Sequence, residues 1–459
     1  MNDNRDNIDF ANTEIRKLFR RLFLPTLMGM LFSMAFIFTD GIFVGNGIGA
    51  QGLAAINLVG PIMLLISGLG MMFGMGASVV AAIHLSHDNI KAARINVTQA
   101  FIAGTIVSIA MGVVCYCFPR QVLTLLGAKG ALYDAAYEYY IWFIPTCLLM
   151  MIESIGLFVI RLDGSPRYAM LANIIPAVVN ILLDYIFIFP CHWGLMGASL
   201  ATDIGGLVAL VMVVCYMLFK AKTLKLKRIK TTSTSIGLTL RNVGYMIRMG
   251  SSALVGELAV AVMMLTGNLV FKDRLGTVGV SAYSIACYLF PLVYMIYNAV
   301  AQSAQPIISF NHGASQPTRV HKTLRLSLSV SALIGLIFTA LFLFFAPAIV
   351  SIFLDSSQPA AVLASEGLPY YAFGFVFMAV NICMTGYYQS IEKASVAVLI
   401  TVLRGILLLI PSFLILPSVI GSHGLWLSVP AAELLTTILI IINQLCLTNK
   451  DHVTHQHTA

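Results

Sequence analysis

Long apolar runs separated by short polar breaks follow one another along nearly the whole chain. A helix needs about 20 residues to cross a bilayer, and twelve runs are long enough. They cover approximately 21–45, 54–84, 95–118, 134–160, 168–190, 193–219, 245–271, 280–310, 324–349, 366–390, 394–417 and 424–447. Segments of alternating hydrophobicity, typical of membrane barrels, are absent. The pattern therefore predicts an all-α integral membrane protein with twelve transmembrane helices.

The composition and the distribution of charge agree with this prediction. Hydrophobic residues make up 59% of the chain and charged residues 10%, against roughly 45–50% and 25% in an ordinary soluble domain. Most Lys and Arg fall in alternate loops, as expected on the cytoplasmic side of a membrane. The net charge of +8 therefore indicates anionic lipid as the partner, not nucleic acid. We expect a bacterial cytoplasmic (inner) membrane with cytoplasmic N- and C-termini.

Aromatic and basic side chains mark the expected membrane surfaces. The three tryptophans, Trp142, Trp193 and Trp426, fall near predicted outer helix ends, where their rings would form an interfacial belt. Arg161 counts among the basic residues of a short cytoplasmic loop predicted over 161–167.

The chain divides into two halves of similar organisation. A basic polar stretch separates six predicted helices from six more, which gives an N-terminal bundle over 1–220, a cytoplasmic linker over 221–243 and a C-terminal bundle over 244–459. "IGAQGLAA" after the first helix resembles "LGTVGVSA" after the seventh at a constant interval of 227 residues. Six helices per repeat give both copies the same orientation, so we expect pseudo-symmetric bundles with a cleft between them, as in transporters.

Six acidic residues lie within the predicted membrane helices: Asp40, Glu153, Asp184, Asp203, Glu257 and Glu433. An aspartate at the bilayer centre costs about 3 kcal/mol, so each needs a reason. Asp40 and Asp184 lie at similar depth, roughly 9 Å inside the predicted outer helix ends at 1.5 Å per residue. Asn180 lies one turn before Asp184 on the same helix face. These three side chains are candidates for a proton or sodium site.

Structural roles remain open for the other acids. Glu153 and Glu433 fit a helix-packing hydrogen bond or an ion pair with Arg404, the one base inside a predicted helix. A phosphate loop and an HExxH metal motif are both absent from the sequence, so an enzyme is the weakest alternative. We expect no cofactor, with H⁺ or Na⁺ as the coupling ion. A receptor or channel is also disfavoured by the repeat.

Three motifs in order resemble one transporter family. They are "FTDGIFVGNGIGAQGLAA", "IRLDGSPRYAMLANIIPAVVNILLDYIFIF" and "GLMGASLATDIG", and "GLWLSVPAAELL" follows in the last helix. This pattern is similar to the multidrug and toxic compound extrusion (MATE) family, especially the branch with the DNA-damage-inducible exporter and the staphylococcal multidrug pump. The resemblance spans the chain and implies two lobes that export cationic or amphipathic compounds by cation antiport.

The resemblance also implies roles for individual residues. Asp40, Asn180, Asp184 and Thr202 match the amino-lobe positions tied to proton or sodium coupling, with Asp203 beside them. Sodium is one candidate ion at Asp40 and Asp184.

A second branch of the family uses acids of the carboxyl lobe. Glu257 resembles one of these, but its tenth-helix partner is absent and only Asn381 stands nearby. Leu157 also replaces a polar residue found in some relatives. These departures leave the identity of the ion open.

Flat organic cations fit a cleft lined by aromatic, sulfur-containing and acidic side chains. Candidates for a substrate or secondary ion site are Glu257 with Tyr283, Tyr288 and Gln302 on the eighth helix, where Tyr294 and Tyr297 are alternatives; plain helix packing is the competing explanation. We expect a monomer to be functional. The main rival is a flippase for a lipid-linked substrate from the same superfamily.

Overall fold

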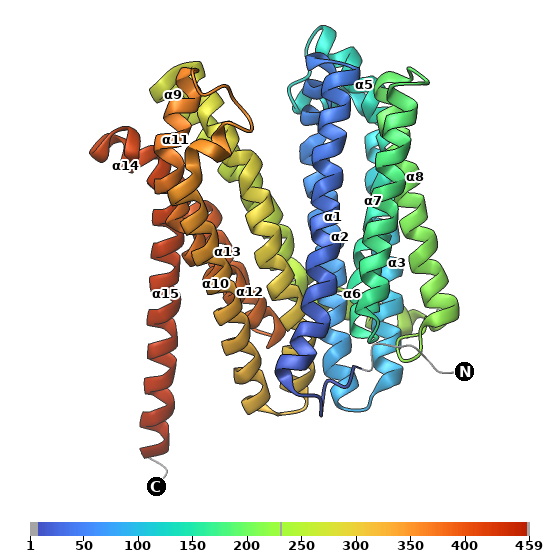
Figure 1. Cartoon of the computed structure of the whole chain (residues 1–459). Coiled ribbons are helices and arrows are strands. Elements are labelled where there is room, and N and C mark those ends of the chain that lie inside the picture. Colours follow the sequence, from blue (N-terminus) through green and yellow to red (C-terminus); the bar gives the residue numbers. More distant parts are fainter. Residues whose placement is uncertain (1–7, 230–231, 457–459) are drawn as a thin grey trace. The chain divides into compact units, whose positions relative to one another are not determined.

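The computed structural model describes residues 8–229 and 232–456, except the side chains of Ala50, Ala131 and 446–456. Within these ranges the chain is helical throughout and contains no β-strand (Figure 1). Residues 230–231, inside the expected linker, lie outside the described residues. The remainder of that segment is only partly irregular, because the helix α9 already begins at Ser233.

The helices of the first half follow the predicted runs. They are α1 (Ile15–Gly47), α2 (Ala50–Ser86), α3 (Ile90–Cys117), α4 (Pro119–Leu125), α5 (Ala131–Phe143), α6 (Thr146–Leu162), α7 (Pro166–Ile188), α8 (Gly194–Cys215) and the π-helix η1 (Tyr216–Lys220). The rest are α9 (Ser233–Gly313), α10 (Pro317–Val350), α11 (Pro359–Ala372), α12 (Gly374–Ser390), α13 (Ala394–Val402), the π-helix η2 (Leu403–Leu407), α14 (Leu409–Ile420) and α15 (Ser422–Gln456).

The described helices account for the twelve predicted crossings. Nine are long and apolar enough to span a membrane, and two bent pairs, α5 with α6 and α11 with α12, raise the number to eleven. The 81-residue α9 breaks at Gly276, whose φ of 64° is non-helical, so it supplies two crossings and brings the total to twelve. A positive φ costs glycine nothing. The prediction of an all-helical membrane protein is confirmed.

The internal repeat extends well beyond the three matches in the sequence. Backbones with positive φ recur at the same interval of 227 residues in Gly49 and Gly276, in Asp88 and Ser315, and in Gly194 and Gly421. Such backbones are uncommon for residues other than glycine, so coincident positions indicate the same turn built twice. The interval therefore gives a reliable correspondence between residues of the two halves.

Contacts divide the chain into two compact units. Unit 1 comprises Met1–Leu258, Gln302–Thr323 and Gln389–Ala394, and unit 2 comprises Ala259–Ala301, Leu324–Tyr388 and Ser395–Ala459. Within unit 1, α7 packs along both α1 and α8. Also within unit 1, the Ser78 hydroxyl of α2 donates to Gln305 Oε1 of α9 at 3.1 Å. These two residues are repeat equivalents, so α2 meets its own counterpart at this point.

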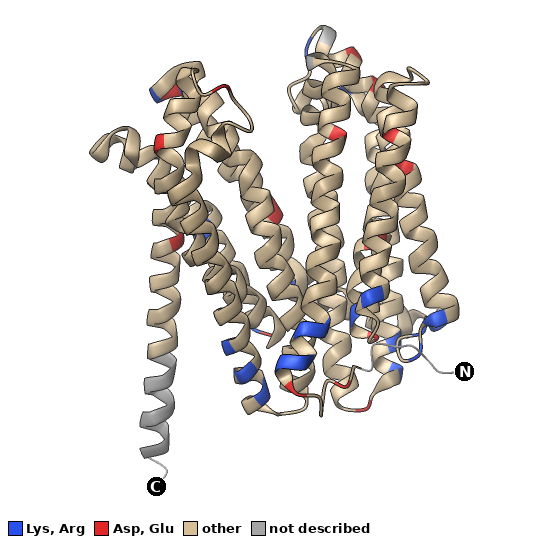
Figure 2. Ribbon diagram, viewed as in Figure 1, with Lys and Arg blue, Asp and Glu red and all other residues tan. Residues whose placement is uncertain are grey.

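Charged side chains gather at particular helix ends (Figure 2). In unit 1, Lys and Arg cluster where α1 and α3 begin, and acidic side chains also lie farther along the helices. Arg161 departs from the loop prediction, because it lies in the last turn of α6 and is only 6% exposed. Trp426 was likewise wrongly predicted for an interfacial belt. Its ring is 2% exposed and packs edge-on against Phe271, because it fills space beside Gly367 in the core of unit 2.

Candidate functional site in the amino-terminal half

Helix α7 presents its polar side chains to the interior of unit 1. Asn180 is 3% exposed and Asp184 is fully buried, while neighbouring apolar residues of the helix face outward. The backbone of α8 approaches closely at Gly205, where a Cβ atom would lie 3.1 Å from the Asn180 Cβ. The absence of a side chain at Gly205 thus permits α8 to bring its own polar residues beside α7.

The other predicted coupling residues come from the two helices that flank α7. Asp40 lies on α1, and Thr202 and Asp203 lie on α8. The Asn180 amide donates to Thr202 Oγ1 at 3.4 Å, and Thr202 in turn donates to the Ala198 carbonyl at 3.1 Å. The structure therefore brings residues from three crossings into one cluster, as the sequence suggested for Asp40, Asn180 and Asp184.

Several oxygen atoms of this cluster have no hydrogen-bond partner among the described residues. They are both carboxylate oxygens of Asp184, Oδ1 of Asp40 and Oδ1 of Asn180. The two carboxylates lie close enough to interact electrostatically. Buried polar atoms are normally paired, and two buried like charges repel. Unpaired oxygens of this kind are the acceptors that a proton or a hard cation such as Na⁺ would satisfy.

Sequence reasoning missed Tyr139. This residue lies on α5, is 1% exposed, and interacts electrostatically with Asp40, Asp184 and Asp203. Asp203 itself accepts a hydrogen bond from the Thr146 hydroxyl at the start of α6. No local pattern marks Tyr139 in the sequence, because an aromatic residue on an apolar helix is usually a packing residue. Only the packing of α5 against α8 reveals its neighbours.

The carboxyl half carries none of these polar groups at equivalent positions. At the repeat interval of 227 residues, the counterparts of Asp40, Asn180, Asp184, Thr202 and Asp203 are Gly267, Leu407, Pro411, Val429 and Pro430. The same scaffold is therefore built without the polar cluster. It follows that folding does not require these side chains, which points to a functional reason for them.

Comparison with known proteins decides the family. The MatE family profile matches residues 25–186 and again 252–414, which together make up more than half of the chain. This chain belongs to the MatE family. The two matches begin one repeat interval apart, so the MatE profile recognises each half separately.

Relatives of this MatE chain carry the names of transport proteins. It is 24% identical to the multidrug export protein MepA of Staphylococcus haemolyticus, over 96% of each chain. It is 23% identical to an FAD transporter of Shewanella oneidensis, over 95% of each chain.

Solved structures share the MatE fold. One is described as an outward-facing conformation of a multidrug resistance MATE family transporter, with a TM-score of 0.86, 20% identity, and coverage of 94% of this chain and 95% of the other. A Pyrococcus furiosus transporter of the MOP superfamily, described as having a binding pocket of reversed polarity, matches with the same TM-score, identity and coverage.

The remaining predicted site residues of this MatE protein are dispersed. In unit 1, Gln302 accepts a hydrogen bond from Arg161 at 2.8 Å, and Glu257 lies against Gly68 of α2. In unit 2, Tyr283 is 1% exposed, stacks on Phe271 and donates to the Met263 carbonyl at 3.3 Å. Tyr288 is 48% exposed. The structure does not join Tyr283 and Tyr288 in a polar cluster.

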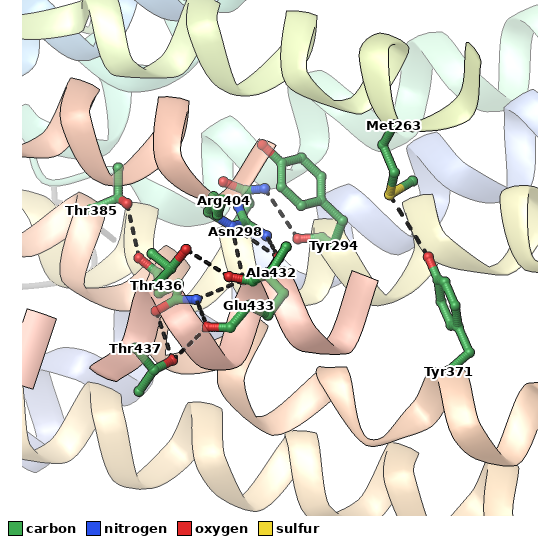
Figure 3. Close-up of polar contacts among 11 residues, drawn as sticks. Met263, Tyr294, Asn298, Tyr371, Thr385, Arg404, Ala432, Glu433, Thr436 and Thr437 are labelled. Carbon is green, nitrogen blue, oxygen red and sulfur yellow. Dashed lines mark hydrogen bonds and ion pairs between the residues drawn. The ribbon is translucent and has the colours of Figure 1, made fainter. Parts of the chain in front are cut away.

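Unit 2 contains a buried ion pair (Figure 3). Arg404, in the π-helix η2, donates through Nε to Oε1 and Oε2 of Glu433 at 3.0 and 3.1 Å. Asn381 donates to Oε2 of Glu433 at 2.6 Å, and Thr437 donates to the Asn381 carbonyl oxygen at 2.9 Å. Pairing of Glu433 with Arg404, one of the structural roles considered for this acid, is thus confirmed.

The two polar clusters differ in charge balance. In unit 2 the carboxylate of Glu433 is neutralised by Arg404, whereas no base pairs with Asp40 or Asp184 among the described residues. Within the same residues, no three His, Cys, Asp or Glu side chains are arranged to hold a metal ion. The amino-terminal cluster can therefore accept one positive charge, while the cluster of unit 2 already contains one.

Proposed function

We propose that this MatE protein is a secondary active exporter of cationic or amphipathic organic compounds, driven by antiport with H⁺ or Na⁺. The observation that carries the proposal is the buried pair of carboxylates, Asp40 and Asp184, with Asn180 beside them and without a counter-ion among the described residues. An uncompensated negative charge in a membrane is costly, so the ion that neutralises it stabilises the conformation that binds it.

The coupling follows from this difference in affinity. An ion shifts a conformational equilibrium only if it binds one state more tightly than the other. Entry of H⁺ or Na⁺ at Asp40 and Asp184 removes the repulsion between the carboxylates, with Thr202 and Asp203 as further contributors. We infer that loading of this site resets the carrier after the organic compound has left. One charge moved across 100 mV is worth about 2.3 kcal/mol.

The substrate class rests on the relatives and on the chemistry of the chain. Two of the relatives are named as multidrug export and FAD transport proteins. The first supports organic cations. The second supports an anionic dinucleotide, and one observation in unit 1 favours it as a second candidate. Arg161 is buried, its guanidinium lies 4.8 Å from the centre of the Phe158 ring, and no carboxylate pairs with it among the described residues.

The setting of the transporter is part of the proposal. The basic residues near the starts of α1 and α3 support cytoplasmic N- and C-termini in a bacterial inner membrane. We further propose that the halves over 1–220 and 244–459 act as the two lobes, joined by a basic linker over 221–243, and that a monomer is functional. Coupling uses H⁺ or Na⁺ and needs no other cofactor.

Transport in proteoliposomes tests the proposal. A fluorescent organic cation is followed under an imposed pH gradient or an imposed sodium gradient, for the wild type and for Asp184→Asn. We expect uphill movement with one of the gradients, which names the ion, and its loss in Asp184→Asn. Asp134→Asn is the matched control, because Asp134 is an exposed acid in the first turn of α5.

Each other outcome has a defined meaning. If neither gradient drives transport of the cation, the drug-export proposal fails and the lipid-linked flippase becomes the leading candidate. If Asp184→Asn transports as well as the wild type, coupling does not occur at Asp184, and Glu257 becomes the next acid to replace.

A further inference from the structure

The fourth membrane crossing is broken in its middle. Its two parts, Leu132–Phe143 and Thr146–Leu162, are bent by 49°. Pro145 precedes the second part and offers no side-chain hydrogen bond to the new helix end. The first N–H groups of a helix have no partner within it, and a buried helix start needs acceptors from elsewhere. Thr146, the first residue of α6, is only 1% exposed.

Asp203 of α8 supplies these acceptors. Its Oδ1 atom accepts a hydrogen bond from the Thr146 hydroxyl, and its carboxylate also accepts from the Thr146 backbone N–H. A negative charge at a helix N-terminus is stabilised by the helix dipole as well as by these bonds. The carboxylate therefore caps α6 from a different helix and connects the bend of the fourth crossing to the position of α8.

The second half of the chain bends at the equivalent place without an acid. Its parts Pro359–Ala372 and Gly374–Ser390 are bent by 46°. The residue equivalent to Asp203 is Pro430, which packs against Gly374 so that a Cβ there would lie 3.1 Å from the Pro430 Cα. The bend itself therefore needs no carboxylate. What Asp203 adds is a cap whose strength depends on its protonation.

We propose that Asp203 is a positioning residue that controls the bend of the fourth crossing: ionised, it caps α6 and holds the bend, and protonated, it releases α6. The inference rests on the proposed function, because it links proton entry to a helix movement. A protonated carboxyl group keeps an acceptor oxygen but loses the charge that faces the helix end. The cap then weakens, and α6 gains freedom relative to α5.

Other titratable groups surround this cap. Tyr139 of α5 interacts electrostatically with Asp203 and also with Asp40 of α1 and Asp184 of α7. Cys147 of α6 interacts electrostatically with Asp203. Neutralisation of Asp40 or Asp184 therefore changes the electrostatic field around Tyr139, which Asp203 shares. The bend of the fourth crossing can in this way respond to loading of the whole cluster.

Hydrogen–deuterium exchange of the purified full-length protein tests the inference without any transport assay. Protection of the amides in 144–150 is measured from pH 5 to pH 9, after correction for the intrinsic pH dependence of exchange. We expect about fivefold faster exchange at the acidic end, as for loss of a helix cap. The equivalent amides in 372–378, beside Pro430, form an internal control and should show no such change.

Variants separate the cap from general stability. Asp203→Asn should lack pH dependence in 144–150 and exchange as the acidic wild type does. Thr146→Val should narrow the pH response, and Thr146→Ser should restore it, because the hydroxyl returns. In proteoliposomes, Thr146→Val should shift the pH profile of transport, and Thr146→Ser should recover the wild-type profile.

The inference is overturned if 144–150 shows no pH dependence in the wild type, or if 372–378 shows the same one. It is also overturned if Asp203→Asn, or Thr146→Val where the former does not fold, keeps the full wild-type response. None of these results depends on transport. Failure of the proposed function would appear instead as absence of ion-driven transport by the wild type.

Discussion

At the scale of single residues, acidic side chains inside the membrane segments differ in what neutralises them. Glu433 has a guanidinium, an amide and a helix partner around it, whereas Asp184 has none of these among the described residues. A carboxylate with a permanent partner gains nothing from a transported ion. A carboxylate without one can bind and release an ion as the surroundings change.

Removal of one partner of the buried pair should therefore be costly. We expect Glu433→Gln or Arg404→Gln to lower the free energy of unfolding by about 3–5 kcal/mol, because each leaves the other group buried and unpaired. The double variant Arg404→Met with Glu433→Leu should recover most of this loss. Denaturant unfolding in detergent measures the effect, with the exposed Glu366→Gln as control. A single variant as stable as the wild type would contradict the structural role of the pair.

At the scale of helices, glycine sets how closely two elements approach. On α9, a Cβ at Gly250 would lie 1.8 Å from the Met72 carbonyl oxygen of α2, and one at Gly76 of α2 would lie 2.1 Å from the Met246 carbonyl oxygen. Backbone atoms cannot move aside as side chains do. These two glycines therefore fix the contact between α2 and the first part of α9 within unit 1.

Gly250→Ala should force these helices apart and destabilise the protein by about 1–3 kcal/mol, as overpacking does. Gly244→Ala, on the same helix, is the matched control because nothing lies within 4 Å of its added Cβ. Its better helix propensity should leave stability unchanged or raise it by up to about 1 kcal/mol. Thermal unfolding compares the two variants, and equal melting temperatures would refute the close contact.

At the scale of the whole molecule, segments distant in the sequence close unit 1. The Phe10 carbonyl accepts hydrogen bonds from Asn311 at 3.2 Å and from Arg319 at 2.9 Å, and Arg319 also donates to the Thr13 carbonyl at 2.8 Å. The Phe10 ring packs on Phe310. The segment before α1 is thereby held against the end of α9 and the start of α10.

Acid should release this segment. The hydrogen bond from the Asn12 side chain, with Arg319 contributing, holds the pKa of Asp9 below its usual 3.8. A lowered folded-state pKa means that the stabilisation is complete above the usual value and is lost as the pH falls through the lowered one. We expect the ¹⁹F resonance of 4-fluorophenylalanine incorporated only at position 10 to stay constant from pH 8 to 5, and to move only at more acidic pH.

Arg319→Gln should produce the released signal already at neutral pH, because its bonds to Phe10 and Thr13 are lost. Lys322→Gln, an exposed base on the same helix, is the control and should leave the resonance unchanged. A resonance that is the same in Arg319→Gln and in the wild type would show that these bonds do not hold the segment.

The sequence by itself determined the membrane class, the twelve crossings, the repeat interval and the pairing of Asn180 with Asp184 on one helix face. Each depends on hydrophobic length or helical periodicity, which are local properties of the chain. Tertiary structure alone decided that Arg161 and Trp426 are buried, that Glu433 is neutralised by Arg404, and that Tyr139, Thr146 and Asp203 meet. These facts depend on which helices pack together, and helix packing brings together residues that no local pattern relates.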